Sequence, residues 1–299
     1  MGTTDVVVDE ATARKYTVDA PSDTARSDLT FILSLHGGGS VGAWQRLYFP
    51  AHDLVDDLGL VVVTPSAKTK QPMSHWTRDA DDEHLRNVVT QTYARFAGRI
   101  RSFWLAGHSQ GGMTSSRLLA TDDWFAARVD GWLSLSGGRL GQAPFVEDFG
   151  PPRTEEERAA MADFMAARRR EVRERPLPDA DFSHVFAVGE HEIDSLPDTS
   201  PWAERYGAGP RQQLPDVVDT EPGQIHDGRF EGRYKTSWGR EPRPGTAQVF
   251  VYPGARDGRV IADVVRLDKG HTEGLEPNIT RTIVELMVSA PGGKASRAA

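Results

Sequence analysis

Cysteine is absent from the 299-residue chain. This absence excludes disulfide bonds, thiolate nucleophiles and cysteine-ligated metal sites, but it leaves the redox compartment open. No apolar run approaches the roughly 20 residues that a membrane-spanning helix needs. The first residues, MGTTDVVVDEATARKYTV, have neither the basic nor the apolar segment of a signal peptide. We expect a cytoplasmic protein, although a secreted chain without its signal peptide would look the same.

Positive charge is also scarce. Lys and Arg total 35 against 43 Asp and Glu, so the net charge is -8 at pH 7. The basic residues gather only at Arg168, Arg169 and Arg170, inside a segment of mixed charge. A nucleic-acid partner is therefore not expected.

Short apolar runs alternate with longer segments of helical pattern. The expected strands are 29–35, 58–65, 101–107, 131–137, 184–189 and 262–268, and the expected helices are 46–57, 80–97, 110–120, 154–175 and 278–289. Nearly continuous apolar strands are typical of a parallel sheet that is buried on both faces. The pattern predicts an α/β fold in a single domain over residues 1–290, followed by a disordered tail over 291–299.

Two segments interrupt this alternation. Residues 141–181 contain a highly charged helical stretch, and residues 195–246 are rich in Pro, Gly, Asp and Arg. The second segment carries the aromatic residues Trp202, Tyr206, Tyr234 and Trp238. A loop of that length within a compact domain is usually functional or mobile.

A candidate nucleophile lies in the stretch FWLAGHSQGGMTSSRLL, residues 103–119. Ser109 stands between Gly107 and Gly111, after a predicted strand and before a predicted helix. A strand–turn–helix of this kind forces the serine into a strained conformation and lifts its hydroxyl clear of the sheet. The amide of Gln110, at the start of the helix, can face a developing negative charge. The alternative is a tight turn with an incidental serine.

A glycine-rich loop follows the apolar strand in LSLHGGGS, residues 33–40. Its amides suit an oxyanion hole, with Gly38 as the first candidate donor and Gly39 as the second. A flexible turn or a phosphate-binding loop is the alternative, but no Lys-Ser or Lys-Thr pair follows the glycines. We expect His36 to order this loop rather than to act as a base.

His271 is the candidate general base. It follows the last strongly apolar run, in VVRLDKGHTEGLEP, well downstream of the serine. His226 is its main competitor, whereas the turn would direct His108 away from the serine hydroxyl. The carboxylate that orients the histidine is expected after the strand in HVFAVGEHEIDSLPD. The candidates, in order of preference, are Glu192, Asp194 and Glu190, with Asp257 and Asp263 as outsiders.

The order serine, acid, histidine along the chain is that of the α/β-hydrolases. The sequence resembles their poly(3-hydroxybutyrate) depolymerase and feruloyl esterase branch over about residues 15–290. The matching stretches are LHGGG at 35–39, LGLVVVTP at 58–65, Trp76 with Asp81 and Asp82, GHSQGG at 107–112, YPGARDGR at 252–259 and LDKGHTEG at 267–274. The stretch YPGARDGR also reads as a hairpin turn before the strand that precedes His271.

This resemblance implies an α/β-hydrolase fold with an eight-stranded, mostly parallel sheet, a Ser-His-acid triad and no cofactor. It also places 141–181 where lids are inserted, so we expect this segment to cap the pocket and residues 195–246 to wall it. The alternative is a surface helix and a packed loop. The chain departs from the branch in having no cysteine and in placing Thr272 and Glu273 after the histidine, where many members have a tryptophan-containing motif.

These features predict a serine esterase whose partner is a small or polymeric ester substrate. Cleavage of an amide, thioester or lactone by the same triad is one alternative. A non-catalytic binding protein that retains the fold is the other. The natural substrate and the oligomeric state do not follow from the sequence.

Overall fold

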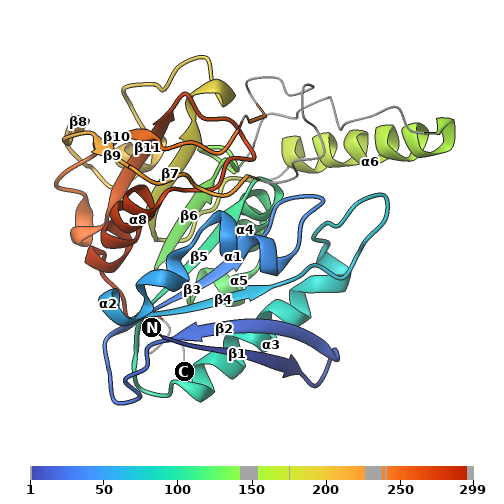
Figure 1. Ribbon diagram of the computed structural model, residues 1–299, viewed down its shortest axis with the longest axis horizontal. Coiled ribbons are helices and arrows are strands. Elements are labelled where there is room, and N and C mark those ends of the chain that lie inside the picture. Colours follow the sequence, from blue (N-terminus) through green and yellow to red (C-terminus); the bar gives the residue numbers. More distant parts are fainter. Residues whose placement is uncertain (1, 142–153, 175, 226–237, 240, 295–299) are drawn as a thin grey trace.

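The computed structural model describes residues 2–141, 154–174, 176–225, 238–239 and 241–294. Within them, eleven strands form one sheet in the order β1-β2-β4-β3-β5-β6-β7-β11-β10-β8, and β9 also pairs with β10 (Figure 1). The strands are β1 (Thr3–Asp9), β2 (Arg14–Ala20), β3 (Leu29–Leu35), β4 (Leu60–Pro65), β5 (Ile100–His108), β6 (Gly131–Leu135), β7 (Ser183–Gly189), β8 (Gln212–Gln213), β9 (Val217–Val218), β10 (Thr246–Val251) and β11 (Ile261–Leu267).

The six central strands, from β4 to β11 in spatial order, are parallel to one another. Their residues are almost all buried, because side chains alternate between two covered faces. In β3, Phe31 and Leu33 enter one hydrophobic cluster while Ile32 enters the other. The predicted mostly parallel α/β sheet is therefore confirmed.

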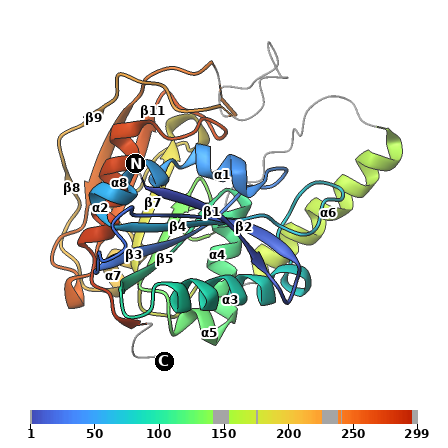
Figure 2. The same ribbon diagram turned by 60° about the horizontal axis from the view of Figure 1, so that its bottom comes forward.

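Helices cover both faces of the sheet (Figure 2). They are α1 (Gly42–Tyr48), α2 (Val55–Leu58), α3 (Arg78–Arg95), α4 (Gln110–Thr121), α5 (Asp123–Ala126), α6 (Glu155–Glu174), α7 (Pro201–Arg205) and α8 (Pro277–Ser289). Apolar residues of α3, α4, α5 and α7 pack with one cluster, and those of α1, α2 and α8 pack with the other. Loops follow the carboxyl ends of the parallel strands, at one end of the sheet.

The sequence patterns located the central strands within a few residues but not the outer ones. The six expected strands correspond to β3, β4, β5, β6, β7 and β11. The sheet has eleven strands rather than the eight that the resemblance implied, because β1, β2, β8, β9 and β10 extend it on both sides. In β1 most residues are exposed, so that strand lacks the continuous apolar run of a buried one. The helix expected over 46–57 is divided at Pro50, because proline has no amide hydrogen to continue the helical ladder.

The two interrupting segments are described only in part. Residues 142–153 and 175 of the candidate lid 141–181 lie outside the described residues, as do 226–237 and 240 of the segment 195–246. Figures 1 and 2 show α6 extending outward from the body. The terminal residues 295–299 also lie outside the described part, whereas the amide of Lys294 donates to Asp130 at 3.0 Å.

The aromatic residues of 195–246 have different places. Trp202 and Tyr206 are buried in the core, where Trp202 packs edge-on against Trp132 with ring centroids 5.8 Å apart. These two rings stabilise the domain and do not wall the site. Trp238 lies at the candidate site, and Tyr234 falls outside the described residues.

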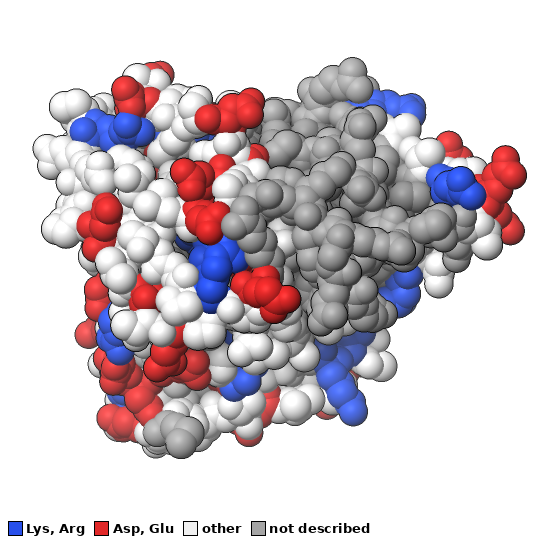
Figure 3. Space-filling model, turned by 45° about the horizontal axis from the view of Figure 1, so that its top comes forward, with Lys and Arg blue, Asp and Glu red and all other residues white. Residues whose placement is uncertain are grey.

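The described helices include none that is both long and apolar enough to cross a membrane. On the face drawn in Figure 3, acidic and basic side chains are interspersed among uncharged ones.

Burial of His184 predicts acid lability. Its ring lies against Trp132, Phe182 and Trp202, and burial lowers its pKa to about 3. The unfolded chain binds this proton near pH 6.5, so stability is retained above that pH and is lost as the pH falls toward the folded pKa. Each pH unit in that window removes up to about 1.4 kcal/mol. Urea unfolding between pH 7 and 5 should show a shallower loss for His184→Phe than for the wild type, and parallel curves would contradict the assignment.

Candidate active site

Ser109 forms the turn between β5 and α4, at the carboxyl end of a central strand. Its φ of 50° and ψ of -116° mirror an extended conformation, which only glycine adopts freely. The flanking glycines are required by close approach. A Cβ at Gly107 would lie 2.2 Å from the carbonyl carbon of Gly111, and one at Gly111 would lie 2.2 Å from the oxygen of Leu35. The glycines thus let the turn form at van der Waals distance from β3.

His271 reaches Ser109 from the loop after β11. Its Nε2 lies 2.8 Å from the Ser109 Oγ, although 162 residues separate the two in sequence. The imidazole is mostly buried, with 8% of the residue exposed. The two predicted side chains are therefore within hydrogen-bond distance.

Glu192 completes the set from a short 3-10 helix, Glu190–Glu192, directly after β7. Its Oε2 lies 2.5 Å from His271 Nδ1. Its Oε1 accepts hydrogen bonds from the Gly189 amide and the Ser136 hydroxyl, both at 2.8 Å. A carboxylate against Nδ1 holds the proton on that nitrogen, so Nε2 presents a lone pair to the serine.

The other predicted acids do not contact His271. Asp194 and Asp257 are exposed, and the carboxylate of Glu190 accepts the amide of Asp268 at 2.8 Å. Asp263 is buried in a different cluster, paired with Arg139. Among the five candidates, Glu192 alone meets the imidazole.

The alternative histidines are elsewhere. His226 lies outside the described residues. His108 turns away from the Ser109 hydroxyl: its Nε2 lies 2.9 Å from the backbone oxygen of His271, and its ring stacks on Tyr48 with centroids 3.8 Å apart. His108 thus packs beneath the imidazole loop.

The glycine loop lies beside the nucleophile. A Cβ at Gly37 would be 3.3 Å from the Ser109 Cβ, and one at Gly38 would be 3.9 Å from the Gln110 Cβ. Within the described residues the amide of Gly38 has no acceptor. The Gln110 amide is in the first turn of α4, where helical amides lack a partner. These two N–H groups are available to a ligand oxygen.

Gly39 is not available in the same way, because its amide donates to the Ser74 carbonyl at 2.7 Å. This bond removes Gly39 from the candidate oxyanion donors. The spacing of Gly37, Gly39 and Gly42 also fits a dinucleotide-binding loop. The Gly42 amide, however, donates to the Ser66 hydroxyl at 2.9 Å. The amides of Gly39 and Gly42 therefore both have protein acceptors, which disfavours their use as phosphate-binding donors.

His36 orders the glycine loop. Its Nε2 accepts the amide hydrogen of Ala67 at 3.0 Å, so Nδ1 carries the proton and donates to the Gly37 carbonyl at 2.7 Å. Burial lowers the pKa of His36 to about 4, which keeps the ring neutral near pH 7. His36 thus acts on the backbone of the loop, at a distance from the imidazole of His271.

Buried charges hold the His271 loop. Arg266 donates to the carbonyls of Glu273 and Gly274 at 2.6 and 2.7 Å and pairs with Glu276. Lys269 pairs with the same carboxylate at 2.7 Å. Because these ions are satisfied by one another and by loop carbonyls, they fix the backbone around the histidine.

One contact of the site, made by Ser136, was not identified in the sequence, whereas Trp238 belongs to the segment 195–246 that was expected to wall the pocket. Ser136, at the end of β6, has a φ of 50° and directs its hydroxyl to Glu192. Two serines, Ser134 and Ser136, occur in this run, LSLSG, and no pattern distinguishes the second. The ring of Trp238 stacks on His271 with centroids 5.2 Å apart, and the Trp238 carbonyl accepts from the Thr272 amide at 2.7 Å.

No family model matches the chain, and no curated protein matches its sequence. Among solved structures, an acetyl xylan esterase from Aspergillus awamori is similar, with a TM-score of 0.51 and 14% identity over 96% of this chain and 100% of that one. A fluorophosphonate-binding serine hydrolase F from Staphylococcus aureus gives 0.39 and 13%, over 64% and 80%. The first match confirms the predicted α/β-hydrolase fold. The second, with a TM-score below 0.5, adds nothing to it, and at such identities neither match establishes the activity.

The strain at Ser109 predicts a stability difference. Ser109→Gly and Ser109→Ala both remove the hydroxyl bonded to His271, but only glycine adopts the observed backbone angles freely. After the entropy cost of glycine, we expect Ser109→Gly to be more stable than Ser109→Ala by about 1 kcal/mol. Urea unfolding of the two variants measures the difference. Equal stability, or a less stable glycine variant, would contradict a strained turn.

Proposed function

We propose that the protein is a serine hydrolase that cleaves carboxylic esters through an acyl-enzyme on Ser109. The observation that carries this proposal is the 2.8 Å contact between Ser109 Oγ and His271 Nε2, with Glu192 against the other ring nitrogen. A hydroxyl is a weak nucleophile unless a base stands within hydrogen-bond distance and is itself oriented by a third group.

In acylation, His271 Nε2 accepts the Ser109 proton as Oγ attacks the ester carbonyl carbon. The carbonyl oxygen becomes an oxyanion, and the amides of Gly38 and Gln110 donate to it. The intermediate then expels the alkoxide, which takes the proton from His271 and leaves as the alcohol. The acyl group remains on Oγ.

In deacylation, water replaces the alcohol. His271 accepts a proton from the attacking water, and the second tetrahedral intermediate releases the acid and returns the proton to Oγ. Glu192 keeps the Nδ1 proton in place and stabilises the imidazolium formed in each half-reaction. Protein groups and water supply every step, so the proposed reaction needs no cofactor.

The substrate class is a further part of the proposal. The motif resemblance favours 3-hydroxyacyl or hydroxycinnamoyl esters, and the structurally similar protein is an acetyl xylan esterase. The alcohol must leave beside His271 Nε2, and the ring of Trp238 stacks on that imidazole. An aromatic surface at this position suits a ring-shaped alcohol. Hydrolysis rates on acetyl, 3-hydroxyacyl and hydroxycinnamoyl esters of aryl and sugar alcohols rank these classes.

The proposed nucleophile is tested with Ser109→Ala. We expect the wild type to hydrolyse p-nitrophenyl acetate and to be labelled at Ser109 by a fluorophosphonate, and the variant to lose both because its base has no hydroxyl to activate. Full activity of the folded variant would exclude the mechanism. A wild type that is neither active nor labelled would instead favour a binding protein, and faster cleavage of matched amides, thioesters or lactones would reassign the substrate.

The proposed acid is tested with a matched pair of variants. Glu192→Gln replaces the carboxylate that contacts Nδ1, so the imidazole loses its orienting charge and kcat should fall by about 10³- to 10⁴-fold. Asp194→Asn changes an exposed carboxylate two residues away and should leave kcat close to that of the wild type. Initial rates on p-nitrophenyl acetate measure both. A larger loss in the Asp194 variant would reverse the assignment.

A further inference from the structure

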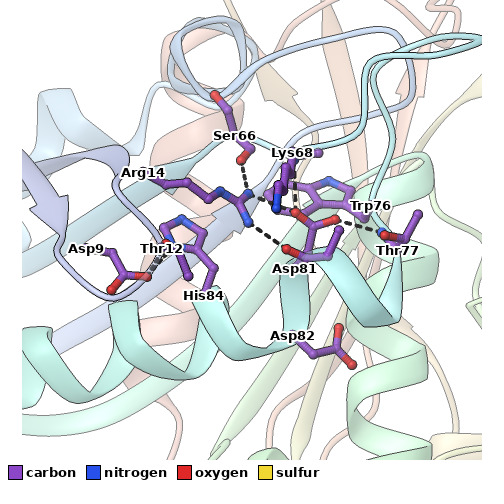
Figure 4. Close-up of polar contacts among 12 residues, drawn as sticks. Asp9, Thr12, Arg14, Ser66, Lys68, Trp76, Thr77, Asp81, Asp82 and His84 are labelled. Atoms are coloured by element: carbon purple, nitrogen blue, oxygen red, sulfur yellow. Dashed lines mark hydrogen bonds and ion pairs between the residues drawn. The ribbon is translucent and has the colours of Figure 1, made fainter.

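A buried carboxylate, Asp81, lies away from the nucleophile in the first turns of α3 and is fully buried. It takes no part in the proposed chemistry. Figure 4 shows that Asp81 and Arg14 point toward one another, and that Asp82 projects from another side of the same helix. A buried ion is costly unless its partners satisfy it, so the partners of Asp81 indicate what its charge does at this position.

Asp81 contacts the segment 66–77 near both of its ends. Its Oδ1 accepts the amide of Lys68 at 3.0 Å, and its Oδ2 accepts the amide of Thr77 at 2.8 Å. Arg14, from β2, donates to Oδ1 at 2.8 Å and also to the carbonyls of Ser66 and Ala80. One ion pair therefore fixes the backbone where the segment leaves β4 and where it enters α3.

The segment held in this way contacts the glycine loop on both sides of Gly38. The Ser74 carbonyl accepts the Gly39 amide at 2.7 Å, and the indole of Trp76 donates to the His36 carbonyl at 2.8 Å. The methyl carbon of Met73 lies only 2.6 Å from the position that a Cβ on Gly38 would take.

The same segment also contacts the other proposed oxyanion donor. The amide of Trp76 donates to the side-chain oxygen of Gln110 at 3.3 Å. At its start, the amide of Ala67 donates to His36. The segment 66–77 is thus bonded to His36 and Gly39, on either side of Gly38 in the chain, and to Gln110 itself.

We propose that Asp81, paired with Arg14, is a positioning residue that sets the oxyanion hole through the segment 66–77. The inference rests on the proposed esterase function. Asp81 touches no reacting atom, and its effect passes through the Ser74 and Trp76 contacts. Because oxyanion contacts strengthen in the transition state, their displacement lowers kcat more than it changes KM.

The neighbouring residue supplies a matched control. Asp82 is also a buried carboxylate paired with an arginine, and it binds Arg117 of α4 through two contacts of 2.7 and 2.6 Å. Among the hydrogen bonds and ion pairs of the described residues, none joins the side chain of Asp82 to the segment 66–77. Asp81→Asn and Asp82→Asn therefore both remove the charge from a buried ion pair, but only the first releases the segment.

The experiment compares kinetics and amide exchange in the full-length variants. For Asp81→Asn we expect kcat on p-nitrophenyl acetate to fall about 10- to 100-fold at nearly constant KM, since small displacements of a positioned group have effects of this size. We also expect faster hydrogen exchange in the peptide covering residues 36–40, where the Gly39 amide is bonded to Ser74. Asp82→Asn should lower the melting temperature but change neither quantity.

The outcomes separate the two proposals. If the wild type is active and Asp81→Asn keeps its kcat, or if Asp82→Asn loses as much, the positioning role is wrong while the esterase function stands. If the wild type is neither active nor labelled at Ser109, both proposals fail.

Should Asp81→Asn not fold, a second variant tests the same role. Arg14→Lys retains a charge beside Asp81 but loses the carbonyl contacts. It should show the same change in kcat and exchange to a smaller degree, and wild-type values would overturn the inference.

Discussion

The arrangement of the site depends on the backbone conformation of Ser109. A serine at φ 50° and ψ -116° is unfavourable, and it persists because β3, β5 and α4 approach so closely that Gly107 and Gly111 cannot carry side chains. The same approach presents the hydroxyl outward and leaves the first amide of α4 unpaired. The strain and the exposed hydroxyl thus have one cause. If the packing had room for a side chain at Gly107 or Gly111, the backbone of Ser109 could also move to less strained angles.

Two of the segments that form the site, the loop of His271 and the segment beside the glycine loop, are held by buried ions. Arg266, Lys269 and Glu276 fix the backbone around His271, and Arg14 with Asp81 fixes the segment beside the glycine loop. In both clusters the arginine also donates to backbone carbonyls. A surface loop has few apolar contacts to order it, whereas a satisfied buried ion joins several backbone groups at once. The charges therefore position the loops more than they stabilise the core.

Sequence patterns identified the parts of this site that depend on local chemistry. Gly107, Ser109 and Gly111 are recognisable because the turn admits few alternatives, and apolar periodicity located the central strands. The sequence ranked Glu192 before Asp194 and Glu190, and Glu192 is the one that contacts His271, but the contact itself depends on how a short helix turns after β7. The loss of Gly39 as a donor depends on a contact with Ser74, which is distant in sequence. The outer strands were missed because a half-exposed strand lacks a continuous apolar run.

The parallel order of the central strands has one more consequence. Ser109, Ser136, Glu192 and His271 all follow the carboxyl ends of neighbouring strands, so one end of the sheet carries the proposed site while the packed layers carry the fold. Loops at that end can lengthen without changing strand register, as the segment bearing α6 does between β6 and β7. Changes in the loops at this end of the sheet can therefore alter the proposed site while the interior of the domain stays the same.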